Sequence, residues 1–352
     1  MFFKFDDAVA ANYQLTLDDI LLDQAPRSDI NSRYGSNIDP YYMGRLPIVA
    51  APMPSIACRS FLASADGARP LDSDRPFAIF ADRFRPLEEQ IDLWRLGAGM
   101  SVGLDDDWFT VVARAVEHEV QHILVDIANG NLDSLVVYLQ KLQDARFDDN
   151  LIIWAGNVTN DRAYARIADL CDYVRVGIGG GSACTTRLGT GVGAGNATAI
   201  ARCAEMKRTL ASSYPPNTIG PAAIVADGGI KNNGDICKAL ACGADLVMLG
   251  KMFAATEESA AASVFNKADG LWYKEYAGLA SSKYNSKSSI EGVAGLIPRG
   301  ASVIDLLNSI DGNLRSAMSY TNSHTLAELK SSNKLLCSST ITLENTTTIR
   351  VI

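Results

Sequence analysis

Eight short runs of β-prone apolar residues recur along the chain, and helical patterns fill most of the segments between them. The runs are continuous, which is typical of strands buried on both faces of a parallel sheet. A chain that repeats strand and helix in this way predicts an α/β fold, and eight strands favour a closed barrel. The runs span residues 46–53, 76–82, 97–104, 122–128, 151–158, 173–177, 223–229 and 246–251.

The segments between the runs predict the helices that surround such a barrel. Helical stretches fit residues 88–96, 109–119, 132–142, 162–170, 198–209 and 234–242. The predicted fold class is therefore α/β, a (β/α)8 TIM barrel, with residues 1–352 forming a single catalytic domain.

The residues before 46 and after 255 break this alternation and predict N- and C-terminal extensions. Residues 266–300 are polar with little periodicity, so we expect a mobile active-site flap, a loop over the barrel mouth. Residues 324–352 are expected to form a C-terminal tail. The Thr-rich stretch 340–352 fits either a small strand pair or a poorly ordered end.

Composition and charge exclude several classes of protein. Hydrophobic residues make up 47% and the net charge is −8, which favours a sizeable core and argues against nucleic acid as a partner. Seven scattered cysteines without a C-x-x-C pair predict free thiols in a reducing compartment. No run approaches the roughly 20 apolar residues of a membrane span, and no signal peptide is evident. We expect a cytoplasmic enzyme with no membrane contact.

Nearly every apolar run ends in polar residues or glycines, at the positions where the active sites of barrels lie. These residues are Asp126, Asn129 and Gly130 at the end of one run, Gly156 and Asn157 at the end of another, Asp227, Gly228 and Gly229 at a third, and Gly250 and Lys251 at a fourth. Tight turns alone require Gly and Asn. The mixture of Asp, Asn and Gly at four run ends favours a site.

Residues 176–195 form the richest segment, with eight glycines in 20 residues and one cysteine, Cys184. Glycines let backbone groups crowd around an ion or a phosphate. Ser182, Thr185 and Thr186 add hydroxyls near the thiol, so Cys184 is predicted to be a nucleophile on a polar loop. A flexible loop with an incidental cysteine is the alternative. The spacing does not match the G-x-G-x-x-G dinucleotide fingerprint, since Ser182 takes the last position.

The turn at Asp227 predicts a nucleotide site. An aspartate at a strand end can accept hydrogen bonds from a ribose diol, and the next two glycines offer N–H groups to a phosphate. Gly250 and Lys251 would complete this cradle, because barrels often bind phosphate between their seventh and eighth strands. The alternative is an ordinary turn between strand and helix, with Lys251 a solvated charge.

A competing motif, H-E-x-x-H, occurs at residues 118–122 and is typical of zinc hydrolases. It requires one continuous helix, so that both imidazoles share a face. His122 instead opens a strand-like run. The sequence therefore argues against a zinc site.

At these motifs the chain resembles the family of IMP dehydrogenase and GMP reductase. The matching stretches include VGIGGGSACTTRLGTGVG, ADGGIKNNGDICKALACGADLVMLGKMFAATEES, YAGLASS, EGVAGLIPRG and LRSAMSY, together with LTLDDILLDQAPRSDINSR and LPIVAAPM near the N-terminus. The resemblance covers most of residues 14–323. It implies a (β/α)8 barrel that assembles as a homotetramer and binds a purine nucleoside monophosphate.

The resemblance also implies roles for particular residues. Cys184 would attack purine C2, with Thr186 and Glu291 handling ammonia. Asp227 would hold the ribose, and the other residues expected at the substrate are Met53, Ser182, Gly228, Gly229, Gly250, Lys251, Tyr276, Gly278 and Leu279. The carbonyls of Gly179, Gly181 and Cys184 would bind K⁺. The expected cofactor is NADPH, with NAD as the alternative, at Arg83, Asp126, Asn129 and Gly130.

Two branches of the family stay open, and the reductase is favoured. The dehydrogenase activates water with an Arg-Tyr pair on a long flap, but residues 279–290 contain no arginine. It usually carries a regulatory domain after the second strand, where this chain has only residues 83–96. DIANGN and AGNV resemble the reductase, whereas TEES and EGVAGLIP resemble the dehydrogenase.

The chain departs from the family pattern at several positions. Pro54 stands where an aspartate is usual, and Arg83 replaces a lysine; Gly180, Leu279 and Asn313 also differ. These changes bear on substrate and cofactor preference. They leave open a third alternative, a nucleotide-binding barrel without catalysis.

Overall fold

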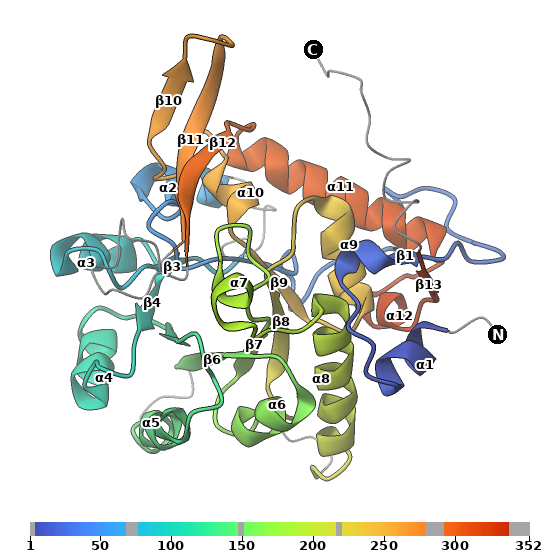
Figure 1. Ribbon diagram of the computed structural model, residues 1–352, viewed down its shortest axis with the longest axis horizontal. Helices are drawn as coiled ribbons and strands as arrows, with labels where there is room; N and C mark the ends of the chain where they lie inside the picture. Colours follow the sequence, from blue (N-terminus) through green and yellow to red (C-terminus); the bar gives the residue numbers. More distant parts are fainter. Residues whose placement is uncertain (1–3, 68–76, 147–150, 216–219, 279–291, 338–352) are drawn as a thin grey trace.

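The computed structural model describes residues 4–67, 77–146, 151–215, 220–278 and 292–337. Within these residues, eight parallel strands form one sheet in the order β2-β9-β8-β7-β6-β5-β4-β3. The sheet closes because the N–H of Ala50 in β2 donates to the carbonyl of Ala78, just before β3, at 2.9 Å. Figure 1 shows helices arranged around this barrel. The predicted (β/α)8 fold is confirmed.

Each of the eight apolar runs contributes one barrel strand. Most residues of these strands are buried, because one face points into the barrel and the other packs against helices. That burial on both faces explains why the sequences do not alternate. The strands are β2 (Ile48–Ala50), β3 (Phe80–Ala81), β4 (Gly99–Val102), β5 (His122–Asp126), β6 (Ile152–Val158), β7 (Tyr173–Val176), β8 (Ala223–Asp227) and β9 (Leu246–Leu249).

The six predicted helices are also confirmed, and side-chain caps start several of them. Asp107, Asn160 and Asn232 each accept a hydrogen bond from the first turn that follows them. The barrel helices are α2 (Arg59–Gly67), α3 (Leu87–Arg95), α4 (Trp108–Glu117), α5 (Asp133–Asp144), α6 (Asp161–Ile167), α7 (Thr186–Thr190), α8 (Asn196–Ala211), α9 (Asn233–Ala241) and α10 (Lys251–Ala254). None of the helices in the described ranges is both long and apolar enough to cross a membrane.

The two predicted extensions meet on one side of the barrel (Figure 1). Strand β1 (Ile20–Leu22) pairs antiparallel with β13 (Lys334–Leu336), so residues far apart in sequence form one small sheet. The remaining elements of the extensions are α1 (Phe5–Ala10), η1 (Leu17–Asp19), α11 (Val303–Tyr320) and α12 (Leu326–Lys330). The first part of the predicted tail therefore packs on the body, while residues 340–352 lie outside the described residues.

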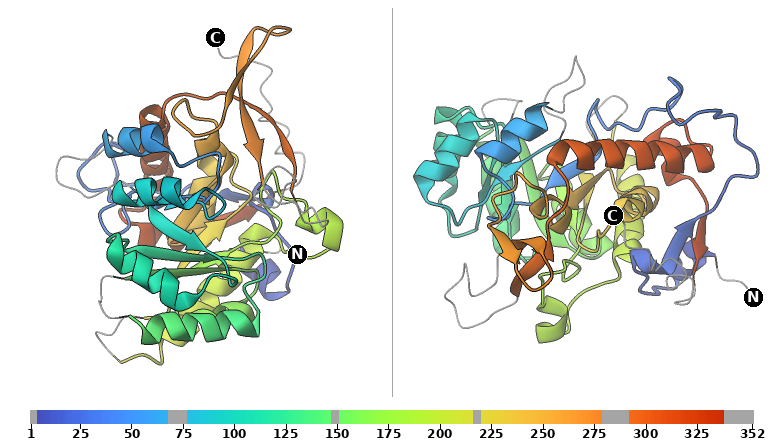
Figure 2. Two further views of the ribbon diagram at one scale, coloured as in Figure 1. Left: turned by 90° about the vertical axis from the view of Figure 1, so that its left-hand side faces the viewer. Right: turned by 90° about the horizontal axis from the view of Figure 1, so that it is seen from above.

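The segment predicted as a flap contains regular structure within its described part. Strands β10 (Ser263–Asn266), β11 (Leu271–Ala277) and β12 (Ala294–Pro298) form an antiparallel sheet that projects from the barrel. Both views in Figure 2 place this sheet at the same end of the barrel as α7. Residues 279–291 lie outside the described residues, and the mobility of the flap stays a prediction.

The turn between β10 and β11 shows which sequence signal was overlooked. Asp269 and Gly270 form an Asp-Gly pair between two β-prone runs, and Gly270 adopts a left-handed φ of +72°. Such a pair is a strong hairpin signal. Residues 266–300 were predicted to form a loop because their composition is polar, and the Asp-Gly hairpin signal was not used.

A buried carboxylate, Asp245, lies just before β9, at the amino-terminal ends of the barrel strands. It accepts hydrogen bonds at 2.6 Å from both Lys207 and Lys330, and one at 2.7 Å from the N–H of Ile224. Burial alone raises the pKa of Asp245, but the two ammonium groups outweigh it and hold the pKa below the ordinary value of 3.8.

Replacing Asp245 with asparagine is expected to lower the free energy of unfolding by about 3 kcal/mol at neutral pH, because two half-buried lysines lose their partner. The folded-state pKa is depressed, so this stabilisation is present above pH 3.8 and is lost as the pH falls through the folded value. Urea unfolding of the unaltered protein and of Asp245→Asn, at neutral and at acidic pH, measures this difference in the free energy of unfolding. Glu205→Gln, which removes an exposed ion pair, is the control with little expected effect. Equal stability of Asp245→Asn and the unaltered protein at neutral pH would contradict the assignment.

Candidate active site

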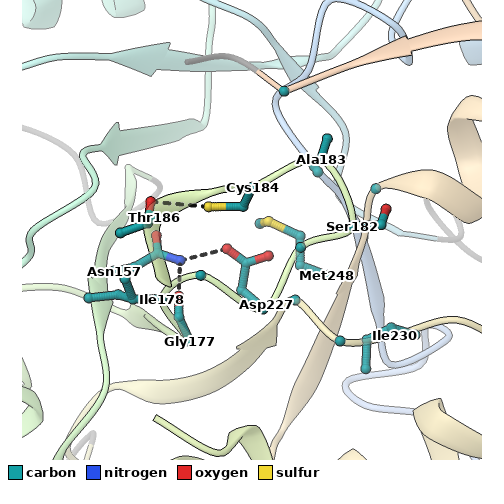
Figure 3. A pocket seen from close by; sticks show the side chains of 18 of the residues that line it. Asn157, Gly177, Ile178, Ser182, Ala183, Cys184, Thr186, Asp227, Ile230 and Met248 are labelled. Carbon is teal, nitrogen blue, oxygen red and sulfur yellow. Dashed lines mark hydrogen bonds between the residues drawn. The ribbon is translucent and has the colours of Figure 1, made fainter. Parts of the chain in front are cut away.

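A cavity of about 620 Å³ opens at the carboxyl ends of the barrel strands. Figure 3 shows Cys184, Asp227 and their neighbours on its wall. Most of the predicted site residues line this one cavity: Met53, Arg83, Asp126, Gly179, Gly181, Ser182, Cys184, Thr186, Asp227, Gly228, Gly229, Gly250, Lys251, Tyr276 and Gly278. The strand order brings these positions together although they span more than 200 residues of sequence.

Two predicted cofactor residues, Asn129 and Gly130, are not part of the cavity wall. Asn129 caps its own turn by accepting from the N–H of Asn131, and the N–H of Gly130 donates to the carbonyl of Asn157 at 2.7 Å. Their contact with a cofactor stays a prediction. Leu279 and Glu291 lie outside the described residues.

The sulfur of Cys184 lies 3.2 Å from the hydroxyl of Thr186 (Figure 3). Cys184 follows β7 on a glycine-rich turn, and its own N–H donates to the carbonyl of Gly181 at 3.0 Å. The backbone of Cys184 also bridges to Gly292, which directly follows Glu291 in the sequence. The segment that leads into β12 therefore contacts the turn that carries Cys184.

Cys184 differs from the other cysteines in its surroundings. All seven cysteines are free, as expected, and four of them are buried: Cys171, Cys203, Cys237 and Cys242. Burial raises the pKa of each of these four thiols, which keeps them protonated and unreactive. Cys184 is half-buried and faces the cavity. Its position suits a nucleophile.

Asp227 is held in place by Asn157, one of the polar residues expected at a strand end, and by Arg175, which the sequence reasoning did not assign to the site. The amide of Asn157 donates to Asp227 Oδ2 at 2.6 Å and to the carbonyl of Gly177 at 2.7 Å (Figure 3). Arg175 donates to the same carboxylate oxygen at 2.8 Å. One carboxylate oxygen of Asp227 thus accepts from both neighbours, and the carboxylate keeps a fixed orientation.

Arg175 also pairs with Asp126, so one guanidinium joins two of the acidic residues that line the cavity. The strand register explains this contact, because Asp126 pairs with Gly156 and Gly156 pairs with Arg175. A Cβ on Gly156 would lie 2.8 Å from the Cβ of Arg175, so only glycine fits between them. Burial disfavours the charge of Arg175, but Asp227 and then Asp126 outweigh it and raise the pKa of its guanidinium.

A second group of residues forms the side of the cavity expected to bind phosphate. The hydroxyl of Tyr276 lies 3.8 Å from the sulfur of Met53, and a Cβ on Gly250 would lie only 3.2 Å from that hydroxyl. Burial raises the pKa of Tyr276, and the nearby Asp227 and Cys184 raise it further, while a hydrogen bond with Ser182 opposes them. Tyr276 therefore remains a neutral phenol that can donate to an anion.

Arg83 fits the binding of a polar cofactor group. Among the described residues, its Nε is buried without a hydrogen-bond partner. A Cβ on Gly103 would lie 1.8 Å from Arg83 Nη1, so the glycine leaves the room that the guanidinium occupies. With Asp126 in the same wall, this side of the cavity offers both a donor and an acceptor.

The side chains and carbonyls of the described residues bear on two metal predictions, the zinc motif and the K⁺ site. Across the part of the chain that the structure describes, no cluster of three His, Cys, Asp or Glu side chains offers a metal site. His118 directly follows α4 and His122 begins β5, as expected, so the H-E-x-x-H segment is not one helix. The neutral carbonyls of the cysteine turn are a donor type that suits a monovalent cation, and K⁺ there stays a prediction.

Lys231 and Asp18 at the cavity rim were also missed. The ammonium of Lys231 contacts both carboxylate oxygens of Asp18 at 2.5 Å, and both residues line the cavity. Asp18 stands in LTLDD and Lys231 follows the DGG turn, so each lay beside a motif already quoted. Their distance in sequence concealed the pair.

These features define the class of protein: a (β/α)8 barrel whose carboxyl-end cavity is lined by both a cysteine, Cys184, and an aspartate, Asp227. The chain belongs to the IMP dehydrogenase / GMP reductase family, whose domain model matches residues 24–348. The expectation drawn from the motifs is confirmed.

Relatives of both names match the chain. An inosine-5′-monophosphate dehydrogenase of Aquifex aeolicus is 35% identical over 260 residues, which cover 70% of this chain and 50% of that protein. GMP reductases of Streptococcus equi and Bacillus licheniformis are 29% and 30% identical, covering 98% and 84% of their lengths. The chain thus spans about half the length of the dehydrogenases that it matches first, and nearly all of one reductase.

Proposed function

We propose that this protein is an NADPH-dependent purine nucleotide oxidoreductase that converts GMP, or a related purine nucleotide, to IMP and ammonia. The observation that carries the proposal is the thiol of Cys184, 3.2 Å from the hydroxyl of Thr186, in one cavity with Asp227. A covalent thioimidate on Cys184 is the proposed intermediate. We also expect the homotetramer that the family resemblance implies.

Binding places the base against the sulfur. Asp227, held by Asn157 and Arg175, accepts hydrogen bonds from the ribose hydroxyls. Ser182 and Tyr276 donate to the phosphate, together with backbone N–H groups of the glycine turns. The sugar phosphate is then fixed at both ends, and purine C2 lies over Cys184.

In the first step, the sulfur of Cys184 forms a bond to C2 of GMP. The C2–N bond to the exocyclic amine breaks, and the amine leaves as ammonia with the proton it requires. Thr186 donates a hydrogen bond near the reacting centre, and Glu291 is proposed to relay the proton. The backbone contact between Cys184 and Gly292 supports this role, since Gly292 adjoins Glu291 in sequence.

In the second step, the C–S bond breaks and IMP is released, with Cys184 leaving as thiolate and regaining a proton. NADPH, when bound, supplies the hydride that takes the place of sulfur on C2. Arg83 and Asp126 are the residues that would hold it, since both line the cavity beside Cys184. K⁺ would be held by the carbonyls of Gly179, Gly181 and Cys184, which would stiffen the turn.

Three observations support the reductase over the dehydrogenase. Only α3 lies between β3 and β4, where the dehydrogenase usually inserts a regulatory domain. Residues 279–290 contain no arginine for activating water. The match extends over 98% of the Streptococcus equi reductase. An IMP dehydrogenase that produces XMP with NAD is the second candidate, favoured by TEES, by EGVAGLIP and by the 35% identity to the Aquifex aeolicus enzyme.

Two parallel assays test the proposal. The protein is mixed with GMP and NADPH, and separately with IMP and NAD, and nicotinamide absorbance is followed. We expect absorbance to fall in the first mixture and to remain constant in the second. Turnover in the second mixture alone would establish the dehydrogenase instead. Nucleotide binding without turnover in either would establish a non-catalytic barrel.

A further inference from the structure

Cys184 lies on a loop of residues 177–195, which we call the cysteine loop. The side chain of Arg187, itself part of this loop, folds back to contact residues near both of its ends. Its Nε donates to the carbonyl of Ile178 at 3.2 Å, and its Nη2 donates to the carbonyl of Ala194 at 2.5 Å. These two carbonyls lie near opposite ends of the loop. One guanidinium therefore closes the loop across its base, and Cys184 lies on the part that it encloses.

The glycines of the loop are shaped around this side chain. A Cβ on Gly179 would lie 2.4 Å from Arg187 Cγ, and a Cβ on Gly193 would lie 2.7 Å from Arg187 Cγ and Nε. Gly179 also adopts a left-handed φ of +72°. Two of the glycines that suggested phosphate binding therefore make room for Arg187.

A buried amide extends this contact to the turn after Asp227. Asn196, the first residue of α8, accepts from Arg187 Nη2 at 2.9 Å through Oδ1, and its Nδ2 donates to the carbonyl of Gly228. A Cβ on Gly229 would lie 2.7 Å from that nitrogen, and one on Gly180 would lie 2.6 Å from it. The amide therefore occupies space that exists only because residues 180 and 229 are glycines.

Arg187 and Asn196 thus link the cysteine loop directly to the turn that follows Asp227. The acceptors of the described Arg187 hydrogen bonds are uncharged oxygens of the cysteine loop and of α8, so its fork acts as a brace between backbone segments. Asn196 is 5% exposed and lies at the start of a 16-residue helix, which gives the brace a rigid support.

We propose that Arg187 and Asn196 are positioning residues that fix the Cys184 sulfur against the base of a nucleotide bound on the Asp227 turn. This inference rests on the proposed function, since it presumes that a purine nucleotide occupies the cavity. Neither side chain touches the reacting atoms in this assignment. A misplacement of about 1 Å at a reacting centre costs about 10²-fold in rate, so the brace has a measurable consequence.

The deciding experiment separates nucleotide binding from the placement of sulfur. GMP affinity is measured by calorimetry, and alkylation of Cys184 by iodoacetamide is followed by mass spectrometry with and without GMP. In the unaltered protein, GMP is expected to bind and to shield Cys184. In Arg187→Ala, GMP is expected to bind with nearly unchanged affinity but no longer to shield Cys184, while kcat falls about 10²-fold.

Matched variants test each part of the brace. Arg202→Ala, which removes an arginine of α8 that pairs with Asp161 outside the cavity, is the control and should shield like the unaltered protein. Arg187→Lys keeps the charge without the fork, so we expect partial shielding, and this variant replaces Arg187→Ala if the latter does not fold. Asn196→Ala is expected to weaken GMP binding as well, because Gly228 loses its donor.

The outcomes distinguish the two proposals. If GMP does not bind the unaltered protein, the proposed function fails. If GMP binds and shields Cys184 equally in the unaltered protein, Arg187→Ala and Arg187→Lys, the proposed function survives and the positioning role is overturned. Alkylation of Cys58 and Cys337, followed in the same digests, reports any general loosening and should not change.

Discussion

Replacing Cys184 with alanine is expected to abolish GMP-dependent NADPH oxidation, with a loss of about 10⁴-fold or more, the size typical of removing a nucleophile. No other cysteine lines the cavity among the described residues, so no second thiol takes its place. Binding of GMP should persist, because the proposed ribose and phosphate contacts come from Asp227, Ser182 and Tyr276. Stopped-flow absorbance and calorimetry measure the two effects separately.

The matched control is Cys337→Ala, which removes a half-buried thiol that directly follows β13 and is not among the residues lining the cavity. It should turn over like the unaltered protein. Retained turnover in Cys184→Ala would refute covalent catalysis, whereas equal loss in both variants would point to a general effect on folding.

Replacing Arg175 with methionine is expected to destabilise the protein by about 3–5 kcal/mol, the range for breaking a buried ion pair. Asp126 and Asp227, 12% and 19% exposed in their side chains, would then face one cavity without their cation. GMP affinity should also fall, because Asp227 loses a donor that fixes its orientation. Urea unfolding and calorimetry provide the two measurements.

Two further variants show whether charge is the reason. Arg175→Lys retains one positive charge but cannot fork toward both carboxylates, so intermediate stability is expected. Adding Asp126→Asn to Arg175→Met should recover part of the lost stability, since one uncompensated charge disappears. Unchanged unfolding of Arg175→Met would contradict the assigned network.

The barrel was predictable because its strands are buried on both faces and its helices keep one apolar stripe. These local patterns survive in sequence whatever the tertiary contacts. The residues at the carboxyl ends of β5, β6, β7, β8 and β9 were predictable as a site for a topological reason, since all parallel strands of a barrel end at one rim.

Contacts between strands were not predictable from the same patterns. Arg175 stands in YVRVG like any strand residue, and only the register shows that it reaches Asp126 across Gly156. The roles of Gly179 and Gly193 were incomplete for a similar reason, because a glycine spacing does not reveal the side chain of Arg187 packed against it. Such contacts depend on side chains distant in sequence or folded back beneath a loop.

The central claim is a bond between Cys184 and the purine ring, and mass spectrometry of an acid-quenched mixture tests it most directly. The protein is mixed with GMP in the absence of NADPH, so that any covalent intermediate cannot be reduced, and then digested. The account predicts that the peptide containing Cys184 gains the mass of GMP less ammonia, and that Cys184→Ala gains nothing. The account would be contradicted if the protein turned over GMP and no adduct was detected, or if the adduct was found on a residue other than Cys184.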